Sequence, residues 1–342
     1  MRTEPLYTAA EMRAAEETYD GPTLDLMERA GTAVADDVLT RYAGAQKVCV
    51  WCGTGANGGD GFVAARRLRQ GGKEVEIVLV GSETKVAGDA AENLRRAKEL
   101  GIRFVETGRV ADVLVDALFG TGFRGAPGSE AAAAIEDVNA SGVPVVAVDV
   151  PSGVDASTGE AGGIAVEAER TLTFHGRKVG LAVAPGLFHA GEVEVVDIGL
   201  AHSETRHRRV TEELLESVPR RGKRDNKYTA GSVLVVGGST GYTGAPSMTA
   251  EAAMRAGAGI VTVCVPEPLN GVFEIRLVEA MSRPCPSDDG GRMSAAAAEV
   301  ILGAAEKARA VAIGPGLGRT DGTQELVRVL LDRLDLPVVL DA

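Results

Sequence analysis

The sequence predicts an α/β protein in which a doubly wound parallel sheet, with helices on both faces, is followed by a second α/β domain. Short runs rich in β-branched residues alternate with longer amphipathic, alanine-rich stretches, which is typical of βαβ units. These short runs are continuously apolar, so we expect strands that are buried on both faces, as in doubly wound sheets. The length of 342 residues agrees with two domains at ~100–200 residues each.

The first half of the chain is expected to begin with helices and to continue as alternating strands and helices. Thr8 and Glu11 have the spacing of a capping box for a first helix, and a second helix is expected from Pro22 towards Tyr42. The strands expected after it are 47–52, 75–81, 102–105, 113–119, 144–150, 170–174 and 192–198. Helices are expected around 62–69, over 87–100 and from about 130.

A polar, charge-dense segment, 201–228, separates this half from the next and has few strand signals. We therefore place the connection there, which gives domains of residues 1–210 and 211–342. In the second domain the expected strands are 231–238, 259–265, 308–314 and 337–341, and the expected helices are 243–257, 294–307 and 322–334. The less regular stretch between 265 and 294 is left unassigned.

Composition and charge exclude several classes of protein. The net charge of −12 and a pI near 5.0 argue against a nucleic-acid-binding protein, which needs a basic face. No apolar run approaches the ~18 residues of a membrane span, and the first residues lack the apolar region of a signal peptide, so a cytoplasmic protein without membrane contacts is expected. Cys49 and Cys52 form a CxxC, which we interpret as core packing in a buried strand, with a metal or redox role as the alternative.

Two glycine-rich loops carry the dinucleotide-binding pattern GxGxxG of Rossmann-like folds. They are Gly53–Gly58 and Gly120–Gly125, each placed after an expected strand. Backbone N–H groups in such loops can approach a pyrophosphate closely because side chains are absent. Asp60, just after the first pattern, is unusual in a phosphate cradle because its charge repels an anion. Its carboxylate can accept hydrogen bonds from ribose hydroxyls or cap the following helix.

Polar side chains from three expected strands come together at one edge of the sheet. In doubly wound sheets ligands bind outside the carboxyl ends of the strands. Asp116 lies inside an apolar run, where a carboxylate is costly unless it is paired, hydrogen-bonded or bound to a cation. Asn57, Asp116 and Ser152 offer oxygen ligands, which suit an alkali or alkaline-earth cation. A buried structural carboxylate is the alternative for Asp116.

The runs GTGANGGDGFVAARRL, VDALFGTGFRG and AVDVPSGVDASTGE together resemble the NAD(P)H-hydrate epimerase family over about residues 7–200. The resemblance implies that Asn57, Asp116 and Ser152 bind a potassium ion. It also implies contacts with the hydrated nucleotide from Ala56, Asn57, Gly58, Gly59, Asp60, Gly120, Thr121, Gly122, Phe123, Arg124, Gly125, Ala126 and Asp149. One departure is Ala56, which stands where the family usually has the first asparagine of NNGGDG.

The second domain resembles the ADP-dependent NAD(P)H-hydrate dehydratase family, which has a ribokinase-like fold. The resemblance rests on NKYTAGSVLVVGGS, GYTGAPSMTAEAAMRAGAGIVTV and AIGPGLGR, and it implies that Ala245 and Gly316 contact the hydrate. In that family the ADP-binding segments and a catalytic aspartate follow the VVLDA strand, at which this sequence ends. The expectation is therefore a partial, inactive dehydratase domain, whereas a complete one would use ADP or ATP with magnesium.

The resemblance implies a nicotinamide-nucleotide repair enzyme. NADH and NADPH can add water to give R and S hydrates; the first domain would interconvert these epimers, as an isomerase, with Asp149 as general acid or base. The second domain, a lyase when complete, would dehydrate the S form. We expect a small-molecule substrate and a homo-oligomer. Two alternatives stay open: an NAD-dependent oxidoreductase, with Glu83 as the ribose-binding acid, and a non-catalytic nucleotide-binding protein.

Two further side chains near the expected site have two interpretations each. Lys178 follows a strand and is interpreted as a surface lysine, with a cation facing the cleft as the alternative. His175 is interpreted as a structural histidine, and its alternative is an acid or base that titrates near neutral pH.

Overall fold

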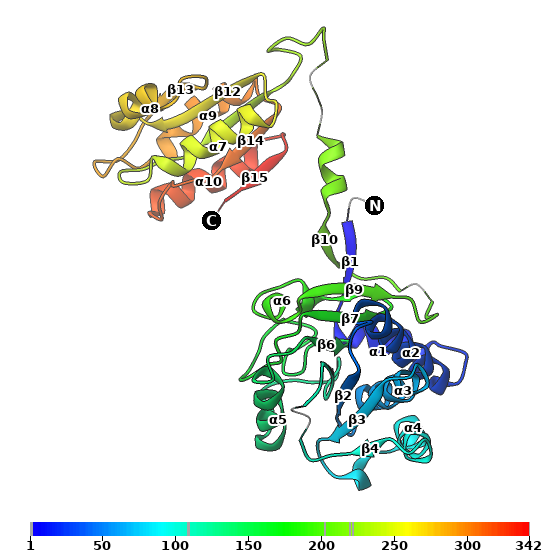
Figure 1. Cartoon of the computed structure of the whole chain (residues 1–342). Helices are drawn as coiled ribbons and strands as arrows, with labels where there is room; N and C mark the ends of the chain where they lie inside the picture. The colour runs from blue at the N-terminus through cyan, green and yellow to red at the C-terminus, as the bar shows by residue number, and fades with distance from the viewer. Residues whose placement is uncertain (1–2, 108–109, 202, 219, 221, 342) are drawn as a thin grey trace. The chain divides into compact units, whose positions relative to one another are not determined.

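The computed structural model describes residues 3–107, 110–201, 203–218, 220 and 222–341, and the chain divides into two compact units (Figure 1). Unit 1 is Met1–Glu213 and unit 2 is Leu214–Ala342. Each has a main sheet in which all paired strands are parallel, so the predicted α/β fold class is confirmed. Among the described residues, none of the helices combines the length and apolar character that a bilayer crossing needs.

The main sheet of unit 1 has seven strands. They are β2 (Lys47–Cys52), β3 (Glu74–Leu79), β4 (Arg103–Phe104), β5 (Val113–Ala117), β6 (Val145–Val148), β7 (Arg170–Phe174) and β9 (Glu192–Val196). Their order is β4-β3-β2-β5-β6-β7-β9. The direction of winding reverses between β2 and β5, and the crevice at such a switch point is where ligands bind in open α/β sheets.

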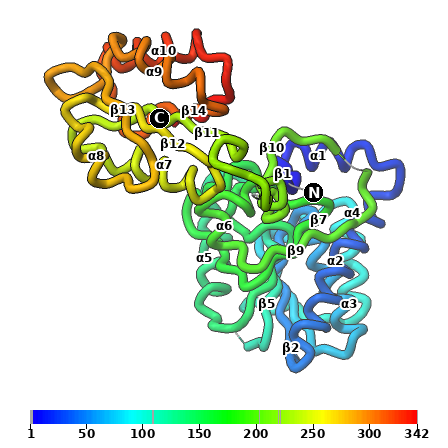
Figure 2. Tube along the Cα trace, turned by 90° about the horizontal axis from the view of Figure 1, so that it is seen from above, coloured from blue at the N-terminus to red at the C-terminus, as the bar shows by residue number. Residues whose placement is uncertain are grey.

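Helices cover both faces of this sheet (Figures 1 and 2). They are α2 (Thr23–Arg41), α3 (Ala56–Gln70) and α4 (Gly88–Glu99) on one face and α5 (Ser129–Asn139) on the other; α6 (Gly186–His189) is a single turn. In β2, Val48 and Val50 pack with α2 and α3, whereas Cys49 and Trp51 pack with α5. Burial raises the pKa of the Cys49 thiol to about 12, which agrees with core packing.

A small second sheet in unit 1 was not predicted. It contains β1 (Thr3–Tyr7), β8 (Arg177–Lys178) and β10 (His207–Val210), in the order β10-β1-β8. The expected helix at the N-terminus is therefore preceded by a strand, and the expected linker contains one. The pairing joins segments about two hundred residues apart, for example Thr3 with Val210, so local patterns carry no signal for it.

The expected capping box at the start of the first helix is confirmed. In α1 (Ala9–Glu17) the backbone N–H of Glu11 donates to Thr8 Oγ1 at 3.3 Å. The N–H of Thr8 donates in return to Glu11 Oε2 at 2.7 Å. These two bonds satisfy backbone donors that the first helical turn leaves free, so α1 begins at the residue that the sequence indicates.

The first glycine-rich segment is mostly helix, which corrects the predicted loop. Helix α3 starts at Ala56, and its N-cap is Gly55. The glycines here permit close packing: a Cβ on Gly58 would lie 1.9 Å from the Gly53 carbonyl oxygen, and one on Gly61 would lie 2.6 Å from the Ala117 Cβ. Glycine is a poor helix former in general, which is why the pattern was interpreted as a loop.

Unit 2 has a five-stranded parallel sheet with the order β13-β12-β11-β14-β15. Its strands are β11 (Ser232–Val236), β12 (Ile260–Pro266), β13 (Met281–Cys285), β14 (Ala310–Ile313) and β15 (Val338–Leu340), and its helices are α7 (Gly244–Arg255), α8 (Asn270–Arg276), α9 (Ala298–Ala305) and α10 (Asp321–Arg333). Helices α7 and α8 pack on one face, and α9 and α10 pack on the other. Strand β13 lies in the stretch that the sequence left unassigned.

Short 3₁₀ helices complete the two units. They are η1 (Glu83–Lys85), η2 (Val179–Leu181), η3 (Glu212–Ser217), η4 (Glu267–Leu269) and η5 (Ala295–Ala297). The remaining predicted strands and helices are present, with ends shifted by a few residues, which is the usual uncertainty of element boundaries.

We predict that Gly58→Ala destabilises unit 1 by about 1–3 kcal/mol, the range for overpacking. The added methyl group would overlap the Gly53 carbonyl, and both are backbone-defined positions that move little. Chemical denaturation followed by the fluorescence of Trp51, the single tryptophan, measures the change. Gly44→Ala, where a Cβ meets no atom within 4 Å, is the control. Equal stability of the two variants would contradict the packing argument.

Candidate active site

A cavity of about 690 Å³ lies at the carboxyl ends of β2, β5 and β6 in unit 1. This volume lies within the range of small-molecule sites, roughly 300–1,000 Å³. The predicted residues that line it are Ala56, Asn57, Asp60, Gly120, Thr121, Gly122, Phe123, Arg124 and Asp149. The two glycine-rich segments and the strand that ends before Asp149 therefore meet at one place, as the sequence indicates.

Six other predicted residues of unit 1 do not line this cavity. Gly58 and Gly59 are buried in α3 on its packed sides, and Gly125 and Ala126 are at the exposed end of their loop. Asp116 and Ser152 are buried next to the cavity wall. There they contact Leu118 and Phe119, the two residues that directly follow β5. These six positions shape or support the site in the described structure.

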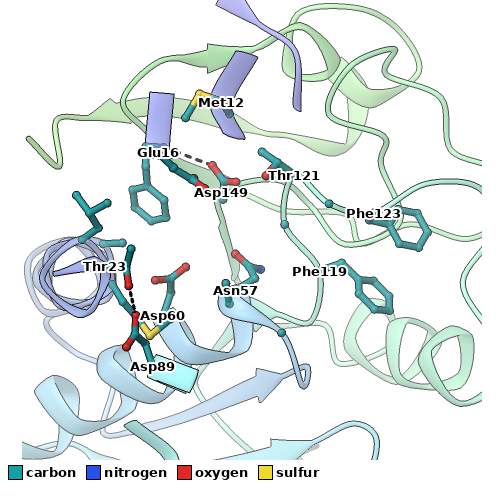
Figure 3. A pocket seen from close by; sticks show the side chains of 18 of the residues that line it. Met12, Glu16, Thr23, Asn57, Asp60, Asp89, Phe119, Thr121, Phe123 and Asp149 are labelled. Atoms are coloured by element: carbon teal, nitrogen blue, oxygen red, sulfur yellow. Dashed lines mark hydrogen bonds between the residues drawn. The ribbon is translucent and has the colours of Figure 1, made fainter. Parts of the chain in front are cut away.

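Asp149 is held in an unusual backbone conformation at the cavity wall. Its φ of 67° is in the left-handed region, which costs a non-glycine residue about 1–3 kcal/mol and is concentrated at functional sites. Its Oδ1 accepts hydrogen bonds from Thr173 Oγ1 at 3.1 Å and from the N–H of Phe174 at 3.4 Å. The side chain is therefore fixed by β7 and points into the cavity (Figure 3).

Lys178 completes the environment of Asp149, and its interpretation as a surface lysine is wrong. Its side chain is fully buried, and Nζ donates to Asp149 Oδ1 at 2.6 Å and to the Phe174 carbonyl at 2.8 Å. Lys178 is buried because β8 pairs with Tyr7 of β1, a strand that the sequence analysis missed. A buried lysine is stable only when it is paired and hydrogen-bonded, and both conditions hold here.

Two further carboxyl groups face the same cavity. Asp60 projects from α3, and Glu16 projects from α1. Desolvation, together with repulsion from Asp149 and Glu16, raises the pKa of Asp60 well above its ordinary value. Desolvation, with repulsion from Asp149, also raises the pKa of Glu16. The cavity therefore has several carboxyl groups and one closely paired lysine, Lys178.

Asp116 and Ser152 form one buried hydrogen-bonded unit. Ser152 Oγ donates to Asp116 Oδ1 at 2.6 Å, and the Ser152 N–H donates to Oδ2 at 2.8 Å. Burial raises the pKa of Asp116 to about 6, against the opposing effect of these bonds. Ser152 Oγ in turn accepts from the N–H of Phe119 at 2.9 Å. The described contacts of Asp116 thus connect β5 to the turn after β6.

Asn57 lies beside this unit. A Cβ on Gly120 would lie 3.0 Å from Asn57 Oδ1, so the amide is packed against the loop that follows Phe119. The side chain is 7 % exposed, and its Nδ2 has no hydrogen-bond partner among the described residues. A buried amide N–H group without a hydrogen-bond acceptor costs free energy, so this position favours a bound group that accepts a hydrogen bond.

The cavity has parts that the sequence analysis did not find. Met12 and Glu16 of α1, Leu26 and Met27 of α2, and Asp89 of α4 close it from the helical side, with Thr23, Ala30, Thr54, Gly55, Leu118, Phe119, Phe174, Lys178 and Ile198 as the other lining residues. The N-terminal helices were predicted, but their amphipathic pattern does not tell a cavity-facing side chain from a core one. Phe119 and Phe123 stack with ring centroids 4.8 Å apart.

Unit 2 has its own cavity, of about 970 Å³. Ala245 and Gly316, both predicted as hydrate contacts, line it together with Ser239, Arg292 and Asp341. Gly316 has a φ of 68°, and a Cβ there would lie 2.6 Å from the Tyr242 carbonyl oxygen, so glycine is required at this turn. The loops after β11 and β14 form the cavity, in the position expected for a ligand site.

The fold and the first cavity define a nucleotide-binding α/β protein with a GxGxxG segment at the switch point of a parallel sheet. Residues 23–180 match the family described as YjeF-related protein N-terminus, and residues 233–342 match the NAD(P)H-hydrate dehydratase family. The chain belongs to the family of bifunctional NAD(P)H-hydrate repair enzymes.

Two relatives show the family membership. The bifunctional NAD(P)H-hydrate repair enzyme Nnr of Moorella thermoacetica is 37% identical over 98% of this chain and 68% of its own length. The enzyme of the same name from Salinibacter ruber is 37% identical over 99% of this chain and 69% of its own length. The chain thus spans about two thirds of the length of these relatives. A Bacillus subtilis ADP/ATP-dependent NAD(P)H-hydrate dehydratase, co-crystallised with ATP and Mg²⁺, is 32% identical over 39% of this chain and 44% of its own, with a TM-score of 0.30.

These matches bear on two expectations from the sequence. The presence of a dehydratase-type second domain is confirmed, but nothing supports its expected inactivity, because its family match extends over residues 233–342. The oxidoreductase alternative is not favoured by the structure: Glu83 lies in η1 and pairs with Lys98 at 2.5 Å.

We predict that Lys178→Met destabilises unit 1 by about 3–5 kcal/mol, because it leaves the Asp149 carboxylate buried without its partner. The double variant Lys178→Met/Asp149→Asn should recover most of this loss, since it removes the unpaired charge. Denaturation followed by Trp51 fluorescence measures both. Lys98→Met, at an exposed ion pair, is the control and should cost no more than about 1 kcal/mol. A Lys178→Met variant as stable as this control would contradict the pairing argument.

Proposed function

We propose that unit 1 interconverts the R and S epimers of the hydrates of NADH and NADPH. The observation that carries the proposal is the Asp149–Lys178 ion pair at the wall of a nucleotide-sized cavity, in a member of the hydrate-repair family. Inversion at C6 of the hydrated ring needs a group that takes up or delivers a proton while a bond from C6 is broken and remade. Asp149 is the proposed general base of this step.

The geometry around Asp149 suits that role. All three donors that contact its side chain, from Thr173, Phe174 and Lys178, reach the same oxygen, Oδ1. Within the described part of the chain, Oδ2 has no hydrogen-bond donor and is available to a substrate or water. The ion pair and the two hydrogen bonds hold the carboxyl group through Oδ1, and we assign Asp149 the role of proton acceptor.

The residues at the edge of the sheet fit a potassium ion. Asn57, Asp116 and Ser152 provide amide, carboxylate and hydroxyl oxygens, which are the donors that alkali ions prefer. The three side chains come from the start of α3, the end of β5 and the turn after β6, and Ser152 contacts Asp116 directly. When bound, potassium would hold the start of α3 and the loops after β5 and β6 in position. The chemical step itself we assign to the side chains of the cavity.

The remaining predicted contacts are proposed to bind the nucleotide. Ala56 at the start of α3 and the loop residues 120–124 line the cavity, and Gly120 and Gly122 add no side-chain bulk there. In unit 2 we propose that the cavity lined by Ala245 and Gly316 binds the S hydrate. ADP or ATP with magnesium is the proposed co-substrate there, in line with the name of the Bacillus subtilis relative.

The proposed function predicts that the full chain accelerates exchange between the R and S hydrates, measured by chromatography of an unequal epimer mixture. Asp149→Asn should lower turnover by ~10²-fold or more, the scale for loss of an acid/base group. Asp36→Asn, an exposed position on α2, should exchange as fast as the wild type. No exchange by the wild-type chain would refute the function, and full turnover by a folded Asp149→Asn variant would remove Asp149 from the mechanism.

The proposed cation site predicts that potassium stabilises unit 1 more than lithium does at the same ionic strength. A ligand that binds only the folded state adds stability that grows with its concentration. Asn57→Leu should abolish the difference between the two salts, because it removes one oxygen ligand. Denaturation midpoints from Trp51 fluorescence measure the effect. Equal midpoints of the wild type in both salts would show that no selective potassium site exists.

A further inference from the structure

Asp60 has no structural role that accounts for its position. It is the fifth residue of α3, whose N-cap is Gly55, so the helix-cap interpretation is wrong. Within the described residues its carboxyl group makes no hydrogen bond or ion pair, although it lines the cavity. The helix dipole slightly stabilises a carboxylate near the N-terminal end of a helix. An exposed position would give the same stabilisation, so the dipole does not explain why Asp60 faces the cavity.

Asp60 faces the same cavity as Asp149, a carboxyl group that is paired with a lysine. Figure 3 shows Asp60 and Asn57 projecting from the start of α3 towards the space into which Asp149 points. Asp149 is paired with Lys178, whereas Asp60 has no such partner among the described residues. The other charged groups that line the cavity are Glu16 of α1, Asp89 of α4 and Arg124 of the loop after β5. Lys178 is engaged by Asp149, and Arg124 is exposed.

The two carboxyl groups differ in their contacts: Asp149 accepts from three donors, whereas Asp60 has none among the described residues. Desolvation, together with repulsion from Asp149 and Glu16, raises the pKa of Asp60 well above its ordinary value, which favours the protonated form of Asp60. Two carboxyl groups whose environments separate their proton affinities are the usual arrangement of a general acid with a general base. The unpartnered, buried amide of Asn57, three residues before Asp60, independently points to a ligand at this end of the cavity.

We propose that Asp60 is a second catalytic residue, the general acid that faces the general base Asp149 across the bound hydrate. The assignment rests on the proposed epimerase function. Asp60 donates its proton to the departing C6 hydroxyl, the C6–O bond breaks, and water leaves while the N1 electron pair forms a C6=N1 double bond. A solvent water then adds to C6 from the other face and gives a proton to Asp149, and the double-bond electrons return to N1.

This sequence balances in atoms and charge. One water leaves and one enters, and one proton has moved from Asp60 to Asp149. The reverse turnover returns the proton, or it returns through solvent. No oxidant or further reactant is required. The two carboxyl groups must therefore lie on different faces of the ring, which agrees with their origin on α3 and after β6.

The first test is Asp60→Asn in the full chain. We expect kcat for epimer exchange to fall by ~10²-fold or more, whereas binding of NADPH, measured by its fluorescence, stays within a few-fold of wild type. Asp60→Glu should recover part of kcat, and Asp36→Asn is the control. Wild-type kcat, or a change confined to KM, would overturn the role of Asp60. Absence of exchange by the wild type would instead refute the epimerase function and this assignment with it.

Two further measurements test the step, and the second of them needs only the wild type. Activity should fall as pH rises through the range in which Asp60 loses its proton, which lies above the ordinary carboxyl range, and Asp60→Asn should lack this fall. Exchange in H₂¹⁸O should place one solvent oxygen on C6 for each inversion, above the rate without enzyme. Inversion with the original oxygen retained would exclude the C–O step, and an alkaline limb that persists in Asp60→Asn would exclude Asp60 as its source.

Discussion

The buried ion pair between Asp149 and Lys178 is the interaction on which the site of unit 1 depends, because it connects the two sheets of that unit. Asp149 follows β6 of the seven-stranded sheet, and Lys178 belongs to β8 of the three-stranded sheet. Strand β8 is held by β1, and β1 is held by β10. A lysine can be fully buried here only because this small sheet covers it and the carboxylate compensates its charge. The small sheet thus supports the proposed active site, although it adds few residues to the cavity.

The second constraint fixes the loop that follows β5 against the turn that follows β6. Both oxygens of Asp116 accept bonds from Ser152, and the hydroxyl of Ser152 accepts from the backbone of Phe119. A buried carboxylate is tolerated in the apolar strand because each oxygen is hydrogen-bonded. The network fixes the loop that begins at Gly120 against the turn that begins at Pro151. The proposed nucleotide contacts of this loop are then positioned by the backbone.

Much of the fold and part of the site could be predicted from the sequence, for a physical reason. Strands of a doubly wound sheet are continuously apolar, and their ligands gather at the carboxyl edge, so strand assignments bring Asn57, Asp60 and Asp149 together. The prediction failed at the two ends of unit 1, because β1 and β10 are short, mostly polar and paired across about two hundred residues. Without β1, Lys178 has nothing to bury it, and its partnership with Asp149 cannot be inferred. The lining residues Glu16 and Met27 were missed because amphipathic helices look the same over a cavity and over a core.

The motif NGGDG can be understood once it is placed on a helix instead of a loop. Residues three apart share a helix face, so Asn57 and Asp60 face the cavity together, whereas Gly58 and Gly61 share the face that packs against β2 and β5. Glycine at those two positions lets α3 approach the sheet more closely than any side chain would permit. The close approach brings the face of α3 that carries Asn57 and Asp60 to the carboxyl edge of the sheet. The glycines therefore position the two polar side chains, Asn57 and Asp60, to which we assign roles in the proposed site. A glycine-rich phosphate loop would use its backbone for binding; here the same pattern brings a carboxyl group and an amide into a cavity that Asp149 already faces.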